Sequence, residues 1–565
     1  MPDNLRPKCQ WVLGMSLYLV GAFSPSVCAQ QTKPAPHDSI VSDAGGSPGN
    51  EACAPCHADV YRSYVQTAMA QASGLAVQNL IAGDFQHAPS GVHYRVYASQ
   101  SEAWLSFERI GDPLVRGTRK LLYFIGSGRR GRTYLFSVDG FFFESPINWY
   151  AQKRLWDMAP AFQSAQQIPL SLPASPSCLA CHTSNMQTPA PGTENKYSLP
   201  PFAHAGITCE RCHGPATGRA LSGSGVINPA KLPPARRDAI CMQCHLEGNV
   251  AIEQPGKHLY DFQPGTDLSE YVRYYVFADD GTRSLRAVSQ SEALASSVCK
   301  RKAGDAMSCT SCHDPHSSPS ADGAISFYRT KCLACHGAPF GARHHPDKPD
   351  CRPCHMPPVT SADVAHTQAT DHRILRIPIP AMPPQQPNPL GLRRLVRFPP
   401  VKNEEDMRDL ALAWESLAEG GMRFAIPEAE ARLRKAVLAT PGDPAVLTAW
   451  GYIEQLHGKR TEARKNYQRA LEIDPLSNSA AINLGVIEAQ EEHVDRAISL
   501  WRQAFERAPA KSAVGLNLAR VSCSIGQFDQ ARTYTLRVLE FNPDLPEAKK
   551  LLRELSADRP SCATR

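Results

Sequence analysis

The pentapeptide Cys-x-x-Cys-His occurs seven times between residues 53 and 355, and this repetition constrains the possible folds more than any other feature. We number the copies motif 1 to motif 7 in chain order. With 19 Cys and 19 His in 565 residues, random order would give only about 0.02 such pentapeptides. The cysteines of the motifs are Cys53 and Cys56, Cys178 and Cys181, Cys209 and Cys212, Cys241 and Cys244, Cys309 and Cys312, Cys332 and Cys335, and Cys351 and Cys354. The histidines that complete them are His57, His182, His213, His245, His313, His336 and His355.

Each motif has the spacing by which c-type haem is attached to protein. Two cysteines three positions apart lie on the same face of a helical turn, so both thiols can form thioethers with one porphyrin. The histidine that follows is then placed to bind the iron as its proximal ligand. A zinc half-site or a disulfide is the alternative, but a zinc ribbon does not require a histidine directly after each cysteine pair. The motifs therefore predict seven covalently attached haem c groups.

The N-terminus has the pattern of a secretory signal. Arg6 and Lys8 precede an apolar run from Trp11 to Phe23, and Val27-Cys28-Ala29 supplies small residues for cleavage. Such a run is too short to span a membrane, and no later segment comes near the required length. We therefore expect residues 1–29 to be a signal peptide, the mature chain to have no membrane span, and the protein to be periplasmic or otherwise exported.

Composition divides the rest of the chain. Residues 30–50 are rich in Pro, Ser and Gly and are predicted to be a flexible tether, and residues 377–400 form a Pro-rich linker. Between them, residues 51–376 are predicted to form a heptahaem cytochrome c domain. Within it, residues 91–146 alternate β-formers with turn residues and predict a small antiparallel β insert. The expected fold class is mainly α: an irregular, haem-packed domain with this insert, followed by an α-solenoid.

A repeat occupies the C-terminal part. Pro441, Pro475, Pro509 and Pro543 are each 34 residues apart, as are Ala429, Ala463, Ala497 and Ala531. This period, with small residues where two helices cross and Pro after the second helix, resembles the tetratricopeptide repeat. Four repeats over about 410–543, within a domain at 401–558, are predicted to dock a redox partner protein, because such stacks form concave binding surfaces.

The sixth ligands of the irons are not given by the motifs. Nine histidines outside them are candidates, of which the favoured ones are His204, His316, His366 and His372. His316 follows His313 so closely that we expect it to bind a neighbouring iron. The other candidates are His87, His93, His258, His344 and His345, and the last two are adjacent, so that one of them is expected to be used.

Three segments resemble the superfamily that contains the tetrahaem cytochrome of ammonia oxidisers, hydroxylamine oxidoreductase and pentahaem nitrite reductase. They are Cys53 to Ala70, Gly206 to Pro215, and Cys351 to Pro357. In the first segment the family has tyrosine, tryptophan, a small hydroxyl residue and a distal histidine at the positions of Tyr61, Tyr64, Thr67 and Met69. The resemblance makes Met69 a tentative distal ligand, with core packing as the alternative. The chain lacks the family's histidine after Gly214-Pro215 and has no Cys-x-x-Cys-Lys motif. Multihaem cytochromes fused to tetratricopeptide repeats share this overall architecture.

The remaining cysteines and the charge add little. Cys299, Cys523 and Cys562 are an odd number, so no disulfide framework is predicted. The formal net charge of +6 omits the haem propionates, so no nucleic-acid partner is inferred.

The leading prediction is thus an exported heptahaem c-type cytochrome that transfers electrons and docks a protein partner. One alternative is a multihaem oxidoreductase acting on a small nitrogen or sulfur compound at a haem with an open coordination position. Another is a scaffold or sensor whose haems report redox state or bind a gas. The number of protein ligands on each iron discriminates among these functions. An electron carrier needs two protein ligands on every iron, whereas an enzyme or a gas sensor needs at least one iron with an open position.

Overall fold

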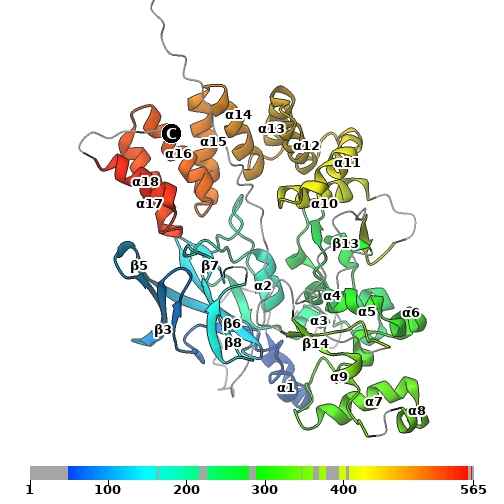
Figure 1. Ribbon diagram of the computed structural model, residues 1–565. Helices are drawn as coiled ribbons and strands as arrows, with labels where there is room; N and C mark the ends of the chain where they lie inside the picture. Colours follow the sequence, from blue (N-terminus) through cyan, green and yellow to red (C-terminus); the bar gives the residue numbers. More distant parts are fainter. Residues whose placement is uncertain are drawn as a thin grey trace, which may run out of the picture.

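The computed structural model describes residues 49–160, 162, 164–215, 226–278, 288–344, 347–360, 368–376, 394–401, 406–557 and 562. The predicted signal peptide, nearly all of the tether, His345, His366 and most of the linker lie outside the described residues. Figure 1 shows three parts: a sheet drawn in blue and cyan, a group of short helices in green, and a helical solenoid from yellow to red that arches over both.

The largest element is a nine-stranded antiparallel sheet. Its main path runs β2-β3-β4-β5-β6-β8-β9, with β1 paired to β5 and β7 to β6. Asp139 and Gly140, both with positive φ (51° and 82°), make the tight turn between β6 and β7. The strands are β1 (Ser73–Leu75), β2 (Gly83–His87), β3 (Val92–Ser99), β4 (Glu102–Arg109), β5 (Asp112–Ile125), β6 (Gly131–Val138), β7 (Phe141–Glu144), β8 (Ile147–Tyr150) and β9 (Leu155–Met158).

The sheet curls until its two edge strands meet. The indole of Trp156 in β9 lies against Gly83 in β2, where an added Cβ would come within 2.1 Å of the ring nitrogen. Inside the curl, the alternate side chains Val92, Tyr94 and Val96 of β3 are fully buried, as strand geometry requires. The sheet therefore has a side-chain core of its own.

These observations correct the predicted fold class. A mainly α, irregular, haem-packed domain with a small β insert is wrong, because a nearly closed antiparallel sheet with an apolar interior makes up much of the N-terminal region. The prediction assumed that porphyrins take the place of a side-chain core. Instead, residues such as Leu105, Phe136 and Phe143 supply the core. The C-terminal α-solenoid is present.

Short helices and three small sheets follow. The helices are α1 (Ala58–Tyr64), α2 (Pro176–His182), α3 (Glu210–His213), α4 (Pro234–His245), α5 (Gln290–Ser296), α6 (Val298–Ala303), α7 (Ala324–His336), α8 (Ala338–Arg343) and α9 (Arg352–His355). The sheets pair β10 (Thr183–Met186) with β11 (Phe202–Ala205), β13 (Val272–Ala278) with β12 (Val250–Glu253) and β16 (Arg394–Phe398), and β14 (Pro358–Thr360) with β15 (Gln368–Thr370). Strand β16 lies at the end of the predicted linker and pairs with β13, so it attaches the linker to the region that contains the seven motifs, which we call the haem-motif region.

Four helical hairpins and a final helix form the solenoid. The first helices are α10 (Met407–Glu419), α12 (Pro444–Leu456), α14 (Asn478–Gln490) and α16 (Ser512–Ser524). Their partners are α11 (Ile426–Ala439), α13 (Arg460–Ile473), α15 (Val494–Arg507) and α17 (Phe528–Phe541), and α18 (Pro546–Leu555) follows. In two hairpins, glycine on the first helix makes room for an aromatic ring of the second helix, since a Cβ on Gly451 would lie 2.8 Å from Tyr467 and one on Gly485 2.4 Å from Trp501.

Both ends of the solenoid are fixed to the rest of the molecule. At the C-terminal end, Arg109 of the sheet pairs with Asp544, and Lys549 pairs with Asp112 at 2.6 Å. At the N-terminal end, Arg273 of β13 donates to Asp406 and Asp409, each at 2.9 Å. The solenoid is therefore clamped at both ends over the haem-motif region.

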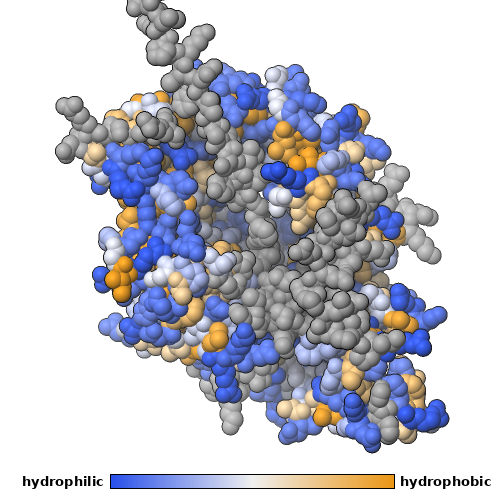
Figure 2. All heavy atoms as spheres, in the orientation of Figure 1, coloured by the Kyte–Doolittle hydropathy of each residue, from blue (hydrophilic) through white to orange (hydrophobic). Residues whose placement is uncertain are grey.

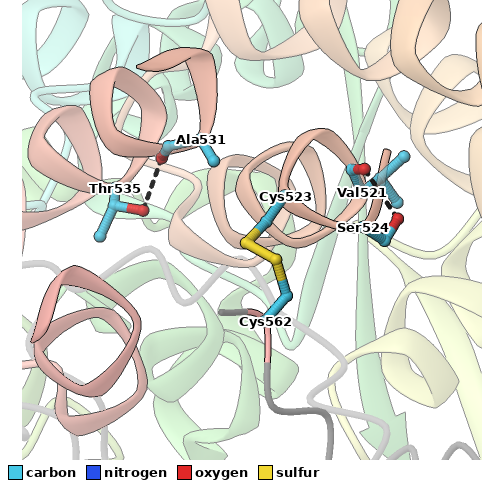
Figure 3. The surroundings of a disulfide bond; sticks show 6 residues. All are labelled: Val521, Cys523, Ser524, Ala531, Thr535 and Cys562. Atoms are coloured by element: carbon cyan, nitrogen blue, oxygen red, sulfur yellow. Dashed lines mark hydrogen bonds between the residues drawn. A yellow bond between two sulfur atoms is a disulfide. The ribbon is translucent and has the colours of Figure 1, made fainter. Parts of the chain in front are cut away.

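A disulfide joins Cys523 of α16 to Cys562, which lies beyond the last helix (Figure 3). The expectation that the three unassigned cysteines form no disulfide is wrong, because an odd number leaves one cysteine over without preventing the other two from pairing. Cys299 is the one left as a thiol.

Among the residues that are coloured in Figure 2, hydrophilic ones predominate, and apolar residues form small separate patches. Within the described ranges, no helix is both long enough and apolar enough to cross a bilayer.

Candidate functional site

Every motif adopts the helical turn that haem attachment requires. Motifs 2, 3, 4, 6 and 7 end α2, α3, α4, α7 and α9, and motifs 1 and 5 begin in short 3-10 turns. In motif 5 the backbone N–H of His313 donates to the carbonyl of Cys309 at 3.0 Å, and motifs 1, 3 and 7 have the same bond. This bond brings both cysteines and the histidine to one side of the turn.

Motifs 1 to 5 line one large cavity of about 3470 Å³. Its volume is several times the roughly 300–1,000 Å³ of a pocket for one small ligand. The roof is the solenoid, because the first helix of each repeat contributes a lining residue: Glu419, Tyr452, Asn483 and Asn517. Motifs 6 and 7 lie on α7 and α9, which Figure 1 shows near α8 at the lower right of the molecule.

Three motif histidines each lie near a second histidine, with the centroids of the two imidazole rings about 6 Å apart. The ring centroids are 5.9 Å apart for His213 and His316, and 6.2 Å apart for His313 and His372. His355 and His344 are 5.7 Å apart. A metal–imidazole bond is about 2 Å long, so two imidazoles on opposite sides of one metal ion have ring centroids about 6 Å apart. The three pairs have the separation that a shared iron requires.

Hydrogen bonds hold one ring of each pair at its Nδ1 atom. Nδ1 of His213 bonds to the carbonyl of Ile227 at 2.8 Å, and Nδ1 of His355 bonds to the carbonyl of Leu375 at 2.6 Å. Nδ1 of His372 bonds to the carbonyl of Thr370 at 2.8 Å. A carbonyl on Nδ1 fixes the tautomer that leaves Nε2 free to bind a metal.

Burial lowers the pKa of four motif histidines, His182, His213, His245 and His313. Burial lowers the pKa of His182 to about 4, against a smaller raising effect of the Ala72 backbone, and His245 lowers it further. Burial also lowers the pKa of His313 to about 4, and His372 and His245 lower it further. Neutral imidazole is the form that binds metals, so both rings are ready to act as ligands near neutral pH.

The other predicted ligands have varied surroundings. His204 packs against Gly49, next to motif 1, and Met69 lines the cavity. His87 and His93 lie in the sheet, where they bond to Ser90 and Asp84, and His258 bonds to Glu253. His345 and His366 lie outside the described residues.

Sequence reasoning missed two polar residues of the cavity wall. Glu144 is 5% exposed and accepts a hydrogen bond from the Cys178 thiol at 3.4 Å. Burial raises the pKa of Glu144 to about 7, against a smaller lowering by that bond. Arg211 has a buried Nε with no hydrogen-bond partner among the described residues, although its Nη2 donates to Ala180. An unpaired guanidinium nitrogen beside three motifs fits a carboxylate such as a porphyrin propionate.

Within the ranges that the structure describes, no group of three or more His, Cys, Asp and Glu side chains is arranged to hold a metal ion by itself. The cavity, the paired imidazoles and the unpaired Arg211 nitrogen all fit haem c.

Two family models match parts of the chain. Residues 151–214, which contain motifs 2 and 3, match the family described as cytochrome c554 and c-prime. Residues 488–555 match the tetratricopeptide repeat, which confirms the repeat predicted from the 34-residue spacing. Together the matches suggest electron transfer combined with protein interaction.

Comparison with curated proteins finds no match. Among solved structures, the hetero-tetramer Cut9–Hcn1 of the APC/C matches at 20% identity and a TM-score of 0.24, over 26% of this chain and 30% of that one. PilF of Pseudomonas aeruginosa matches at 23% identity and a TM-score of 0.25, over 27% of this chain and 69% of that one. These partial likenesses carry no functional argument.

Proposed function

We propose that this chain is an exported electron-transfer protein that carries seven covalently attached haem c groups. The observation that carries the proposal is the pairing of three motif histidines with second histidines about 6 Å away. Two of these pairs line the cavity that motifs 1 to 5 share. An iron between two imidazoles is closed to substrate and suited to electron transfer.

In this proposal each motif supplies two thioether cysteines and the proximal histidine of one haem. His316 is the distal ligand at motif 3, His372 at motif 5 and His344 at motif 7, and His204 serves motif 1. When bound, haem iron accepts and returns one electron. The residues of the chain hold each group, set its orientation through the Nδ1 bonds, and exclude water.

Export is supported by two features of the chain. The N-terminal pattern is that of a signal peptide, and the disulfide between Cys523 and Cys562 is of the kind that persists in oxidising compartments. For the repeats, we propose that they recognise a redox partner protein, as concave helical stacks do.

The test is the intact mass of the chain, recovered from the periplasm of a bacterial host that has the haem-attachment machinery. The expected mass exceeds that of the mature polypeptide by seven haems. A variant carrying both Cys178→Ala and Cys181→Ala should lose one haem only. A chain without covalent haem, or one retained in the cytoplasm, contradicts the proposal.

A second candidate function is an oxidoreductase that acts on a small nitrogen or sulfur compound at motif 2. The observation that favours it is the setting of His182, which is buried and whose Nδ1 has no hydrogen-bond partner among the described residues. Glu144 and the unpaired hydroxyl of Thr133 add polar groups to the same cavity. Electron paramagnetic resonance of the oxidised protein decides: a high-spin signal that nitrite, hydroxylamine or sulfite alters supports the enzyme, and purely low-spin signals support the carrier.

A further inference from the structure

Contacts between motifs show how they are arranged in space. Four pairs of thiols from different motifs lie within hydrogen-bonding reach of each other: Cys53 and Cys209, Cys181 and Cys244, Cys241 and Cys309, and Cys332 and Cys351. The Cys312 thiol lies near enough to Cys335 for a charge interaction. These contacts link motif 1 to 3, motif 2 to 4, motif 4 to 5, motif 5 to 6, and motif 6 to 7.

Hydrogen bonds hold motifs 2, 3 and 4 together independently of the thiols. Nη2 of Arg211 in motif 3 donates to the carbonyl of Ala180 in motif 2 at 3.0 Å. Nε2 of Gln243 in motif 4 donates to the carbonyl of Arg211 at 3.1 Å. Motifs 1 to 4 therefore form one group, which we call the inner group.

Motifs 6 and 7 form a second group, the outer group. Arg329 of α7 donates to the carbonyl of Gly341 in α8 at 3.2 Å and to that of Pro349, just before motif 7, at 3.1 Å. Neither motif lines the cavity. Each group also reaches the surface at one motif, because Cys56 of motif 1 and Cys335 of motif 6 are exposed cysteines.

Motif 5 touches both groups. On the inner side, Cys309 contacts Cys241, and His316, three residues after the motif, faces His213 of motif 3. On the outer side, the Cys312 thiol lies near enough to Cys335 for a charge interaction. The ring of Tyr328 in α7 lies 5.9 Å from that of His313, and the Arg352 guanidinium of motif 7 lies 5.0 Å from the same tyrosine ring.

We propose that motif 5 is the bridge that connects an inner group of four haem sites to an outer group of two, so that electrons cross the molecule between motif 1 and motif 6 through it. The inference rests on the proposed function. An electron leaves a one-electron donor protein, which is oxidised at one end, and reaches a one-electron acceptor protein, which is reduced at the other. No bond is formed or broken in the chain.

The test counts the haems that an electrode can reach from each end of the haem-loaded protein. In a Cys299→Ser background, one preparation is bound to gold through Asp59→Cys, next to motif 1, and another through Arg343→Cys, in the outer group. Both sites are exposed. Integrated voltammetric current, divided by bound protein, gives the electrons exchanged per chain.

Removal of motif 5 by Cys309→Ala with Cys312→Ala should leave four electrons per chain from the Asp59→Cys anchor and two from the Arg343→Cys anchor. The matched control, Cys178→Ala with Cys181→Ala at motif 2, should leave six from either anchor. Six electrons from both anchors in the motif 5 variant would overturn the bridge. Parent protein without covalent haem would instead refute the proposed function.

A milder variant keeps the test decisive if loss of motif 5 prevents folding. His313→Met retains both cysteines but gives that site a methionine ligand, which raises its potential. All seven electrons should still be exchanged, but those of the outer group should exchange several-fold more slowly from the Asp59→Cys anchor. His182→Met at motif 2 is the control and should leave the exchange of the outer group unchanged. Equal rates for the two variants would overturn the bridge.

Discussion

The imidazole rings of His213 and His316 lie with their centroids 5.9 Å apart and their planes 17° from parallel. The two residues belong to different motif segments, and His213 is held by the Ile227 carbonyl at its Nδ1. This distance is nearly the same as that between two imidazoles bound to one metal ion. His316, just after motif 5, is therefore placed to share a metal with His213 of motif 3.

His316→Ala should therefore open one coordination position while leaving haem content unchanged. The expected result is conversion of one low-spin iron in seven to a high-spin form, measured by low-temperature electron paramagnetic resonance. His93→Ala is the control, because His93 lies in the sheet and pairs with Asp84. If His316→Ala has as many low-spin irons as the parent protein, His316 is not an iron ligand.

Gly485→Ala tests the packing that builds the solenoid. Alanine raises helix propensity by about 1 kcal/mol, but its Cβ would lie 2.4 Å from the Trp501 ring. Overpacking of this kind costs about 1–3 kcal/mol, so the net effect on the free energy of unfolding should be a loss. Gly442→Ala, where an added Cβ meets no atom within 4 Å, should be neutral or stabilising. Thermal unfolding compares the two, and Trp501→Leu added to Gly485→Ala should restore stability.

Asp544→Asn tests the clamp between solenoid and sheet. Asp544 accepts hydrogen bonds from Arg109 and Lys549. Its replacement should lower the free energy of opening of α17 and α18, measured by hydrogen exchange, by about 2 kcal/mol. Hydrogen exchange of those helices measures the loss. Arg434→Ala, on an exposed ion pair within α11, should change protection little.

The same clamp should depend on pH. Burial alone would raise the pKa of Asp544, but the bonds from Arg109 and Lys549 outweigh it and hold the pKa below its usual value. Its stabilising effect is thus complete above the ordinary aspartate pKa of about 4, and is lost as pH falls through the lower pKa of the folded state. Hydrogen exchange of α18 should accelerate in that window in the parent protein, and less so in Asp544→Asn.

Cys562→Ser should loosen the end of the solenoid. The disulfide closes a loop of 39 residues, and removing such a link typically costs about 2–4 kcal/mol. Faster hydrogen exchange confined to α16, α17 and α18 is the expected result, while Cys299→Ser should leave these helices unchanged. Equal exchange in both variants would show that the disulfide does not stabilise this region.

The parts of the structure that sequence predicted well depend on local spacing. The 34-residue period revealed the helical hairpins, and the glycines that support Tyr467 and Trp501 recur with that period. The cysteine spacing of each motif predicted a helical turn, because the pattern and the turn involve the same five residues.

The parts that sequence missed depend on residues brought together from far apart. The curled sheet is closed by Gly83 against Trp156, and both lie outside the predicted β insert. Likewise, the spacing of His316 from His313 predicted a ligand for a neighbouring iron but did not identify His213 as its partner, and nothing in the neighbouring sequence indicates the pairing of Cys523 with Cys562. The assumption that haem replaces a core also hid the apolar interior of the sheet, although its alternating strands were visible.

The most direct test of the central claim is a reductive titration of the purified, exported protein. Under anaerobic conditions, dithionite is added until the visible spectrum stops changing, and ferricyanide is then added to reoxidise the chain. The account predicts that each chain takes up seven electrons and returns all seven to ferricyanide. Uptake of far fewer electrons by protein of correct mass, or no haem spectrum at all, would contradict it.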